Sequence, residues 1–577
     1  MDCLLNQMVP MRDGILLATD IYFPSAKGPW PVIIERTPYG KTNQSRSEID
    51  IQGREISRRE MAQKFTAKGF VMIFQDCRGR YDSEGEFVKY VNEANDGFDT
   101  YLWIVDQVWS DGRIGSMGLS YAAHTQLAAA GLNPPGLKAM VLDSGGFDNA
   151  YRWGIRQGGA FELKQATWAY KQSRSEEEFD SNEIMEWFQR MPWAEGASPL
   201  APGSSFEEYL LDQWRHGTFD DFWKHPGMYN EPFYNDVPDI PILFMSSWFD
   251  VYVPSTIHNY TALNGNQLIM GPWLHGDRNS ITSGDVIFGN SASFDGNVGT
   301  SWLDYRISWF ESIFMKDAVE KPCVKIFEMG GGIGKWQSEI HHGGEWKSFE
   351  TWPPLDVTSR KWYLGADCSL LDAANPGESI LFSDPSNPVP TLGGQATSGK
   401  PVFVGGSFEQ VEAPQFFGAS GDYRPLIERD DVLYFETEIL EDDVVIAGEI
   451  EVGITFIADG NDFDIAAKLV DVYPDGTAIN ISDSIQRARY RHSYEKPTLA
   501  KPGVKDRLSV ELPQTCNRFV KGHRIRLMIS GSNFPHFDVN PNSGEPEGYA
   551  NHARKAYTTI VLDESYLRAD VRGLSRA

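Results

Sequence analysis

Ser120 is the side chain whose neighbours best suit it to act as a nucleophile. It lies in the stretch R-I-G-S-M-G-L-S-Y-A-A-H-T-Q at 113–126, where a short apolar run leads into a helix-like segment of small residues. Gly118 and Ala122 are small enough to let a strand and a helix approach closely around the serine, as a strained nucleophile elbow requires. A helix beginning at Tyr121 would also direct its first backbone N–H groups toward a developing oxyanion.

A Gly-x-Ser turn flanked by small residues is common, so the elbow needs support from the rest of the chain. The strand-like run 240–245 leads into S-S-W-F-D, which ends at Asp250, and the run 267–271 leads into P-W-L-H, which ends at His275. The order Ser, Asp, His, with each residue following a strand, is that of the α/β-hydrolases. The sequence therefore predicts a catalytic triad of Ser120, Asp250 and His275.

Other histidines fit this chemistry less well. His124 lies one helical turn beyond Ser120 on the same element, so we expect it to be packed there. His341 and His342 are adjacent but lack a third ligand at the spacing that a metal site needs. We expect neither a metal nor an organic cofactor.

Alternating apolar runs and helix-like segments predict the elements that must position these residues. The segment 8–23 alternates about an Asp-Gly turn, which predicts a hairpin. Continuous apolar runs, typical of strands buried on both faces, lie at 30–35, 69–74, 114–117, 138–143, 240–245 and 267–271. With helices between them, these strands predict a doubly wound α/β sheet with right-handed crossovers.

The pattern changes twice along the chain. Residues 148–235 lose the strand pattern and become helical and rich in aromatic residues, which predicts a helical cap inserted into the sheet domain. After about residue 350 many short strand-like runs with turn signals predict a β-sandwich or jelly roll. We therefore expect a catalytic domain of 1–147 and 236–350, a cap of 148–235 and a β domain of 351–577.

Composition limits the classes of function. The 577 residues carry a net charge of −28, which disfavours a nucleic-acid or anionic-membrane surface because phosphate binding needs dense positive charge. The five cysteines form no C-x-x-C pair, so a disulfide framework is not expected. Neither a signal peptide nor an apolar run of about 18 residues is present, which favours a cytoplasmic protein without a membrane span. Whether the protein forms a homo-oligomer stays open.

Several motifs together resemble one family, the cocaine-esterase-like (CocE/NonD) serine hydrolases, relatives of X-prolyl dipeptidyl peptidases and α-amino-acid ester hydrolases. The motifs run nearly from end to end: V-P-M-R-D-G at 9–14, T-P-Y at 37–39, Q-D-C-R-G-R at 75–80, S-E-G-E-F at 83–87, G-L-S-Y at 118–121, W-F-D at 248–250, G-P-W-L-H at 271–275, K-L-V-D-V-Y-P-D-G at 468–476, G-H-R-I-R at 522–526 and S-N-F-P at 532–535. Taken jointly, these motifs are specific to this family.

The resemblance implies a hydrolase sheet, an inserted helical cap and a C-terminal jelly roll that helps to close the active site. It implies the same triad, with the Tyr39 O–H and the backbone N–H of Tyr121 forming the oxyanion hole. One departure is Ala123, where many members have glycine; its methyl group would narrow the space under the elbow.

The expected substrate is a small ester or amide whose acyl group is attached transiently to Ser120. The resemblance implies acidic residues shortly after the triad aspartate in enzymes that recognise a free α-amino group, and this chain has Tyr252 and Val253 there. An uncharged acyl group, with aromatic groups among the candidates, is therefore favoured, and a cap acid such as Glu162 is the alternative partner for an ammonium group. The candidate substrate-binding walls are Trp153, Phe161, Trp168, Trp248 and Tyr252. X-prolyl dipeptidyl peptidase and amino-acid ester hydrolase or acylase activities remain alternatives, as does a non-catalytic ligand-binding protein on a hydrolase scaffold.

Overall fold

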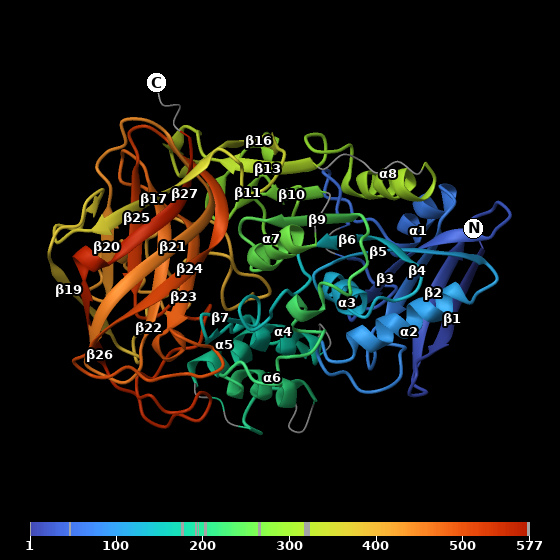
Figure 1. Cartoon of the computed structure of the whole chain (residues 1–577), viewed down its shortest axis with the longest axis horizontal. Coiled ribbons are helices and arrows are strands. Elements are labelled where there is room, and N and C mark those ends of the chain that lie inside the picture. The colour runs from blue at the N-terminus through green and yellow to red at the C-terminus, as the bar shows by residue number, and fades with distance from the viewer. Residues whose placement is uncertain are drawn as a thin grey trace.

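The protein consists of an α/β region, a β-sandwich and a small group of helices beside both (Figure 1). The computed structural model describes residues 2–45, 48–174, 178–190, 193, 195–200, 205–263, 267–316 and 323–573. In Figure 1 the sandwich lies on the left and the α/β region on the right. The group of helices at the bottom comprises α4 (Lys164–Gln172), α5 (Ser181–Gln189) and α6 (Ser205–Arg215).

A mixed β-sheet forms the centre of the α/β region. Its strands follow in the order β1 (Asp2–Pro10), β2 (Leu16–Phe23), β4 (Val71–Asp76), β3 (Trp30–Thr37), β5 (Ser110–Leu119), β6 (Leu137–Asp143), β9 (Ile242–Ser247), β10 (Gln267–Gly271), β13 (Cys323–Met329) and β16 (Gly344–Phe349). Every pairing from β4 to β13 is parallel, and the pairings at the two ends are antiparallel. The predicted hairpin and the predicted parallel strands are confirmed.

Helices cover both faces of this sheet, because its central strands are apolar on both sides. The helices are α1 (Arg58–Ala67), α2 (Glu93–Val105), α3 (Tyr121–Ala130), α7 (Val253–Ala262) and α8 (Trp302–Phe314). Successive residues of β3 point to opposite faces: Ile33 lies in one core cluster with Phe65 of α1 and Phe310 of α8, whereas Ile34 lies in another with Leu127 of α3. The predicted doubly wound α/β-hydrolase architecture is confirmed.

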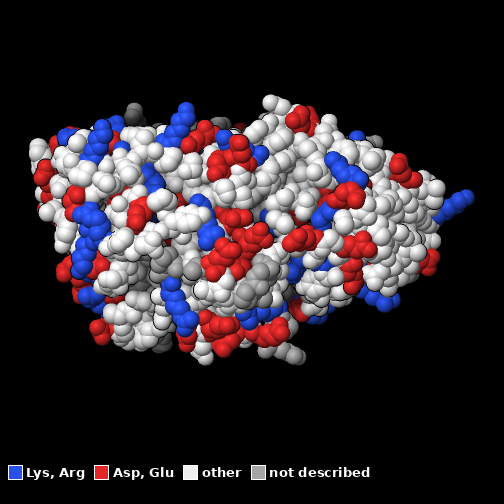
Figure 2. All heavy atoms as spheres, turned by 90° about the horizontal axis from the view of Figure 1, so that it is seen from below, with Lys and Arg blue, Asp and Glu red and all other residues white. Residues whose placement is uncertain are grey.

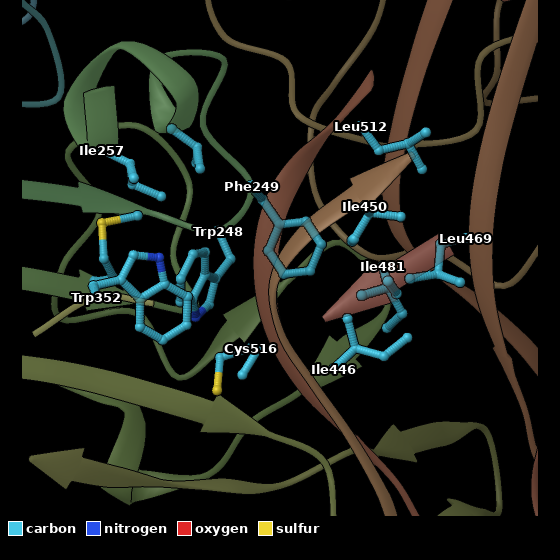
Figure 3. Close-up of a cluster of buried hydrophobic side chains, with 14 of the residues drawn as sticks. Trp248, Phe249, Ile257, Trp352, Ile446, Ile450, Leu469, Ile481, Leu512 and Cys516 are labelled. Carbon is cyan, nitrogen blue, oxygen red and sulfur yellow. The ribbon is translucent and has the colours of Figure 1, made fainter. Parts of the chain in front are cut away.

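The C-terminal region is a β-sandwich, as predicted. One sheet contains β17 (Val357–Leu364), β18 (Leu370–Leu371), β19 (Glu378–Ser383), β21 (Val444–Ala458), β24 (Lys505–Phe519), β26 (Ala556–Val561) and β27 (Tyr566–Arg572). The other has the order β20 (Val432–Glu436), β25 (Arg524–Ser530), β22 (Asp464–Val472) and β23 (Ala478–Arg487). Side chains such as Ile450 and Leu469, seen in Figure 3, belong to one buried cluster between the sheets. A jelly-roll connection of these strands remains a prediction.

Shorter elements complete the chain. A small sheet contains β11 (Thr282–Ser283), β12 (Val286–Ile287), β14 (Gly334–Trp336) and β15 (Glu339–His341). The three bottom helices and the hairpin of β7 (Arg156–Gln157) and β8 (Ala160–Phe161) fall within the predicted cap, 148–235. The predicted domain boundaries themselves remain predictions. None of the helices in the described part of the chain is both long enough and apolar enough to cross a membrane.

The cap is joined to the sandwich through hydrogen bonds that its backbone N–H groups donate near His536. The Leu163 N–H donates to the His536 carbonyl oxygen at 2.9 Å, and the Phe161 N–H donates to Asp538 Oδ1 at 2.8 Å. The His536 ring is buried and stacks on Phe537 with a centroid distance of 4.1 Å. Among the described residues, neither ring nitrogen has a hydrogen-bond partner. This imidazole therefore lies at a junction that both regions share.

Burial, with the charges of Lys164 and Lys468 nearby, lowers the pKa of His536 to about 3. The unfolded chain binds this proton more tightly than the folded protein does, so stability is complete above about pH 6.5 and falls as the pH drops toward 3. Between pH 6.5 and 5 we expect His536 to cost about 2 kcal/mol of unfolding free energy. Calorimetry of His536→Phe should show a smaller drop in Tm over that interval than calorimetry of the parent protein. Equal drops would show that Asp483, whose Oδ2 lies 4.0 Å from the His536 Nδ1, compensates for the charge.

Candidate active site

Ser120 occupies the sharp turn between β5 and α3. Its backbone has φ +61° and ψ −119°, a strained conformation for a residue other than glycine, and its N–H donates to the Asp143 carbonyl oxygen at 2.9 Å. Its side chain makes no capping hydrogen bond to the helix. A Cβ on Gly118 would lie 2.4 Å from the Ala122 Cβ, so these small residues are what the turn requires. The geometry is that of a nucleophile elbow.

Ala123, the departure from the family pattern, is accommodated by a neighbouring glycine. Ala123 is completely buried, and a Cβ built on Gly145 would lie 2.9 Å from its methyl group and 2.5 Å from the Ser120 carbonyl oxygen. Gly145, in the loop after β6, therefore leaves the space that the alanine methyl group occupies.

His275 and Asp250 are hydrogen bonded to each other in loops that follow β10 and β9. The His275 Nδ1 lies 2.7 Å from the Asp250 Oδ2, and both side chains are buried. The other carboxylate oxygen, Oδ1, accepts the Tyr252 N–H at 3.1 Å. With both oxygens engaged, the carboxylate is fixed in orientation, and it can hold the imidazole with its Nδ1 protonated.

Ser120 and His275 line the same cavity, which has a volume of about 550 Å³. Tyr39 and Trp168 line it too, and the sandwich contributes Ser398. Residues from the hydrolase sheet, the cap and the sandwich thus meet around the serine. This arrangement brings together a hydroxyl, an imidazole with an aspartate behind it, and a phenol, which is the set of groups that acyl transfer requires.

The loop that carries Tyr39 is held at several points. The Tyr39 carbonyl oxygen accepts from the Asn43 side-chain amide at 2.7 Å, and the Lys41 N–H donates to Asp76 Oδ1 at 2.6 Å. Arg80 donates to the Pro38 carbonyl oxygen at 3.0 Å. Because it also donates to the Gln172 side chain at 2.9 Å, it ties this loop to α4 of the cap.

Two polar side chains of the cavity wall were not anticipated from the sequence. Arg58 of α1 donates to both carboxylate oxygens of Glu35 on β3, at 2.5 and 2.8 Å, and the pair is buried. The signal was a glutamate at the end of the otherwise apolar run W-P-V-I-I-E, because a charge buried in a strand needs a partner.

The structure brings only part of the predicted aromatic wall to the cavity. Trp168 lines it. Tyr252 lies beside His275, with ring centroids 5.7 Å apart, but it is not among the residues that line the cavity. Its ring packs near the His275 imidazole, and its contact with a substrate remains a prediction.

Trp153, Phe161 and Trp248 are not among the residues that line this cavity. Trp153 lines a different cavity, and Phe161 is completely buried in the aromatic core of the cap. Trp248 is completely buried as well; its indole N–H donates to the Phe327 carbonyl oxygen at 2.8 Å, and its ring lies beside Trp352 in Figure 3. These rings lie away from the cavity at Ser120, because core packing takes up most of their surfaces.

Within the described ranges, no group of three or more His, Cys, Asp or Glu side chains is arranged to hold a metal ion. The expectation that no cofactor is needed remains a prediction.

Comparisons with known proteins agree with this architecture. The family model described as X-Pro dipeptidyl-peptidase (S15 family) matches residues 13–277, and that of the X-Pro dipeptidyl-peptidase C-terminal non-catalytic domain matches residues 318–568. A cocaine esterase from Rhodococcus sp. (strain MB1 Bresler) is 30% identical over 93% of this chain and 92% of its own length. The chain belongs to the cocaine-esterase-like family of serine hydrolases. Membership makes it an enzyme that hydrolyses ester or amide bonds.

Two solved structures cover almost the whole of this cocaine-esterase-like hydrolase. An aminopeptidase from a marine sediment archaeon, Thaumarchaeota archaeon, has a TM-score of 0.77 at 23% identity, and an α-amino-acid ester hydrolase has a TM-score of 0.75 at 25% identity. Each match covers 99% of this chain and 97% of the other. The fold is therefore shared over all three regions.

Proposed function

We propose that the protein is a serine carboxylesterase or amidase in which Ser120 is the nucleophile, His275 the general base and Asp250 the residue that orients the base. The observation that carries the proposal is that Ser120 opens onto the same cavity as an imidazole bound to a buried aspartate at 2.7 Å. A fluorophosphonate probe followed by peptide mass spectrometry tests it. Modification at Ser120 is expected, and modification elsewhere alone would contradict it.

The reaction proceeds in two steps. His275 Nε2 takes the Ser120 hydroxyl proton as Oγ attacks the carbonyl carbon, and the imidazolium then gives that proton to the leaving alcohol or amine. Water, deprotonated by the same imidazole, attacks the acyl-enzyme; the serine recovers its proton and the acid leaves. In both steps the Tyr39 O–H and the Tyr121 N–H stabilise the negative oxygen. The Tyr121 N–H suits this role because the first N–H groups of a helix have no acceptor within the helix.

An uncharged acyl group fits this cavity better than an α-amino-acyl group. A carboxylate without a cationic partner, close to the nucleophile, would bind the ammonium group through strong charge-assisted hydrogen bonds. The cap acid Glu162 is paired with Lys164 at 3.2 Å, and Glu35 is paired with Arg58. Glu55, which also lines the cavity, is exposed, so its attraction for a cation is weakened by water.

The alternative activities can be separated by substrate. We expect the highest rate with a p-nitrophenyl ester of an uncharged acid. The rate should be lower with an ester of an amino acid that has a free α-amine, and lowest with an X-prolyl anilide. A faster reaction with the free amine would favour the amino-acid ester hydrolase alternative, and cleavage of the anilide at the highest rate would favour the peptidase.

Partner and location expectations remain proposals. Figure 2 shows Lys and Arg side chains dispersed among Asp and Glu side chains on one face, and the chain as a whole is acidic. This supports a small-molecule partner rather than nucleic acid or an anionic membrane. We propose a cytoplasmic enzyme and leave homo-oligomer formation open.

Tyr39→Phe removes the proposed oxyanion donor while keeping the ring. We expect kcat to fall by about 10²–10³, because the donor acts mainly on the charge that develops in the transition state. KM should change much less than kcat. Steady-state kinetics on a p-nitrophenyl ester provide the measurement, and equal changes in kcat and KM would contradict the role in the oxyanion hole.

A further inference from the structure

A hydrogen bond inside the cavity connects the cap to the proposed oxyanion hole. The Trp168 indole N–H lies 3.1 Å from the Tyr39 hydroxyl oxygen, and both residues line the cavity that contains Ser120. An indole N–H can only donate, whereas a phenolic oxygen both donates and accepts. The direction of this bond is therefore fixed: Trp168 donates and Tyr39 accepts.

The Trp168 indole is itself held in place. The Lys89 Nζ lies 3.7 Å from the centroid of the indole ring. The Tyr121 ring is nearly parallel to the indole, with an angle of 13° between the ring planes and 6.4 Å between the centroids. Lys89 is in turn fixed by a hydrogen bond of 2.7 Å to Gln165, which lies on the same helix, α4. With Trp168 only 8% exposed, rotating the indole away from Tyr39 would disrupt packing on several sides.

We propose that Trp168 is a positioning residue that orients the Tyr39 hydroxyl for the oxyanion, beyond any contact its ring makes with the acyl group. The proposal rests on the function proposed above. A phenolic O–H lies near the plane of its ring and has two preferred orientations. A donor on one side of the oxygen selects the orientation in which the proton points to the other side. The accepted bond also polarises the O–H and strengthens it as a donor.

A second consequence concerns the cap. Trp168 is on a cap helix, whereas Tyr39 is on a loop of the hydrolase sheet. The donor that stabilises the transition state is thus oriented only when α4 is docked with Trp168 in the cavity that Ser120 lines. In this arrangement the cap contributes to the rate of the chemical step as well as to the shape of the pocket.

Trp168→Phe tests the proposal, because phenylalanine keeps an aromatic wall but lacks the N–H. We expect kcat for a p-nitrophenyl ester to fall about tenfold with KM changed by less than about twofold, since a misplaced group costs rate rather than binding. In a Tyr39→Phe background the same substitution should change kcat by less than about twofold, because no hydroxyl is left to orient. A similar fall in both backgrounds, a change confined to KM or an unchanged kcat would overturn the proposal.

Trp153→Phe is the matched control. Trp153 is another buried tryptophan of the predicted cap, and in the part of the chain that the structure describes its indole N–H has no hydrogen-bond partner. The kcat of the Trp153→Phe variant should equal that of the parent protein. If Trp168→Phe fails to fold, β-(3-benzothienyl)alanine at 168, which replaces the N–H with sulfur at nearly the same size, should give the same tenfold fall. No fall with this residue would overturn the proposal.

The two proposals fail in different ways. If Ser120 is not the nucleophile, Ser120→Ala remains active and the function proposed above fails. If Ser120→Ala is inactive but the effects of Trp168→Phe and Tyr39→Phe simply multiply, only the positioning role fails.

Discussion

Ser120→Ala is expected to lower kcat for a p-nitrophenyl ester by about 10⁶, because without Oγ no acyl-enzyme can form and only binding and the oxyanion hole remain. The fold should survive. Alanine lacks only the serine hydroxyl oxygen, which makes no capping hydrogen bond to α3. Since both residues carry a Cβ, alanine should tolerate the backbone angles of this turn about as well as serine. Initial rates at saturating substrate and Tm from calorimetry provide the two measurements.

Ser116→Ala is the matched control for this substitution. Ser116 is a buried serine on the same strand, β5, and its hydroxyl donates to the Gln126 side chain at 2.9 Å rather than lining the cavity. Its loss should lower Tm and leave kcat near the parent value. Activity retained by Ser120→Ala, or lost equally in both variants, would rule out Ser120 as the nucleophile.

The sheet could be predicted because its strands carry their own signal. Runs such as P-V-I-I are apolar at every position, and in the structure Ile33 and Ile34 are buried on opposite faces. Once parallel order was inferred, the strand ends had to meet at one edge. This physical constraint, rather than any local motif, brought Asp250 and His275 together in the prediction.

Side chains whose contacts are distant in sequence could not be placed in the same way. Trp248 stands two residues before Asp250, and its position in the sequence predicts a wall of the substrate pocket. Its indole N–H instead meets the carbonyl oxygen of Phe327, and its ring packs near Trp352 (Figure 3). Neither partner is close to it in sequence. Aromatic type alone does not tell a pocket wall from a core residue, because both remove the same apolar surface from water.

Trp168 shows the complementary difficulty. The sequence indicated an aromatic residue in the cap that could touch substrate, and the structure places it at the cavity. Its bond to Tyr39 depends on how α4 docks against a loop more than a hundred residues earlier, which no spacing encodes. Likewise, the room for Ala123 comes from Gly145 on the next strand's loop.

Asp250→Asn should lower kcat by about 10⁴ with the geometry of the site preserved. The Tyr252 N–H donates to Oδ1 of the aspartate, so an asparagine would place its carbonyl oxygen there and its NH₂ group against the Nδ1 of His275. An amide that donates to Nδ1 forces the ring proton onto Nε2, the atom that must accept the serine proton. The base would be present and correctly located, but in the wrong tautomer.

Asp148→Asn is the control that isolates this effect. Asp148 is also buried and also lies 2.7 Å from a histidine Nδ1, that of His258, but neither residue lines the cavity. Its substitution should lower Tm, since Ser255 also donates to it at 2.5 Å, while kcat stays within about twofold of the parent value. If both substitutions reduced kcat alike, the loss would reflect general destabilisation. A loss confined to Asp250→Asn ties the rate to the proton on one imidazole, which is what a base-assisted serine requires.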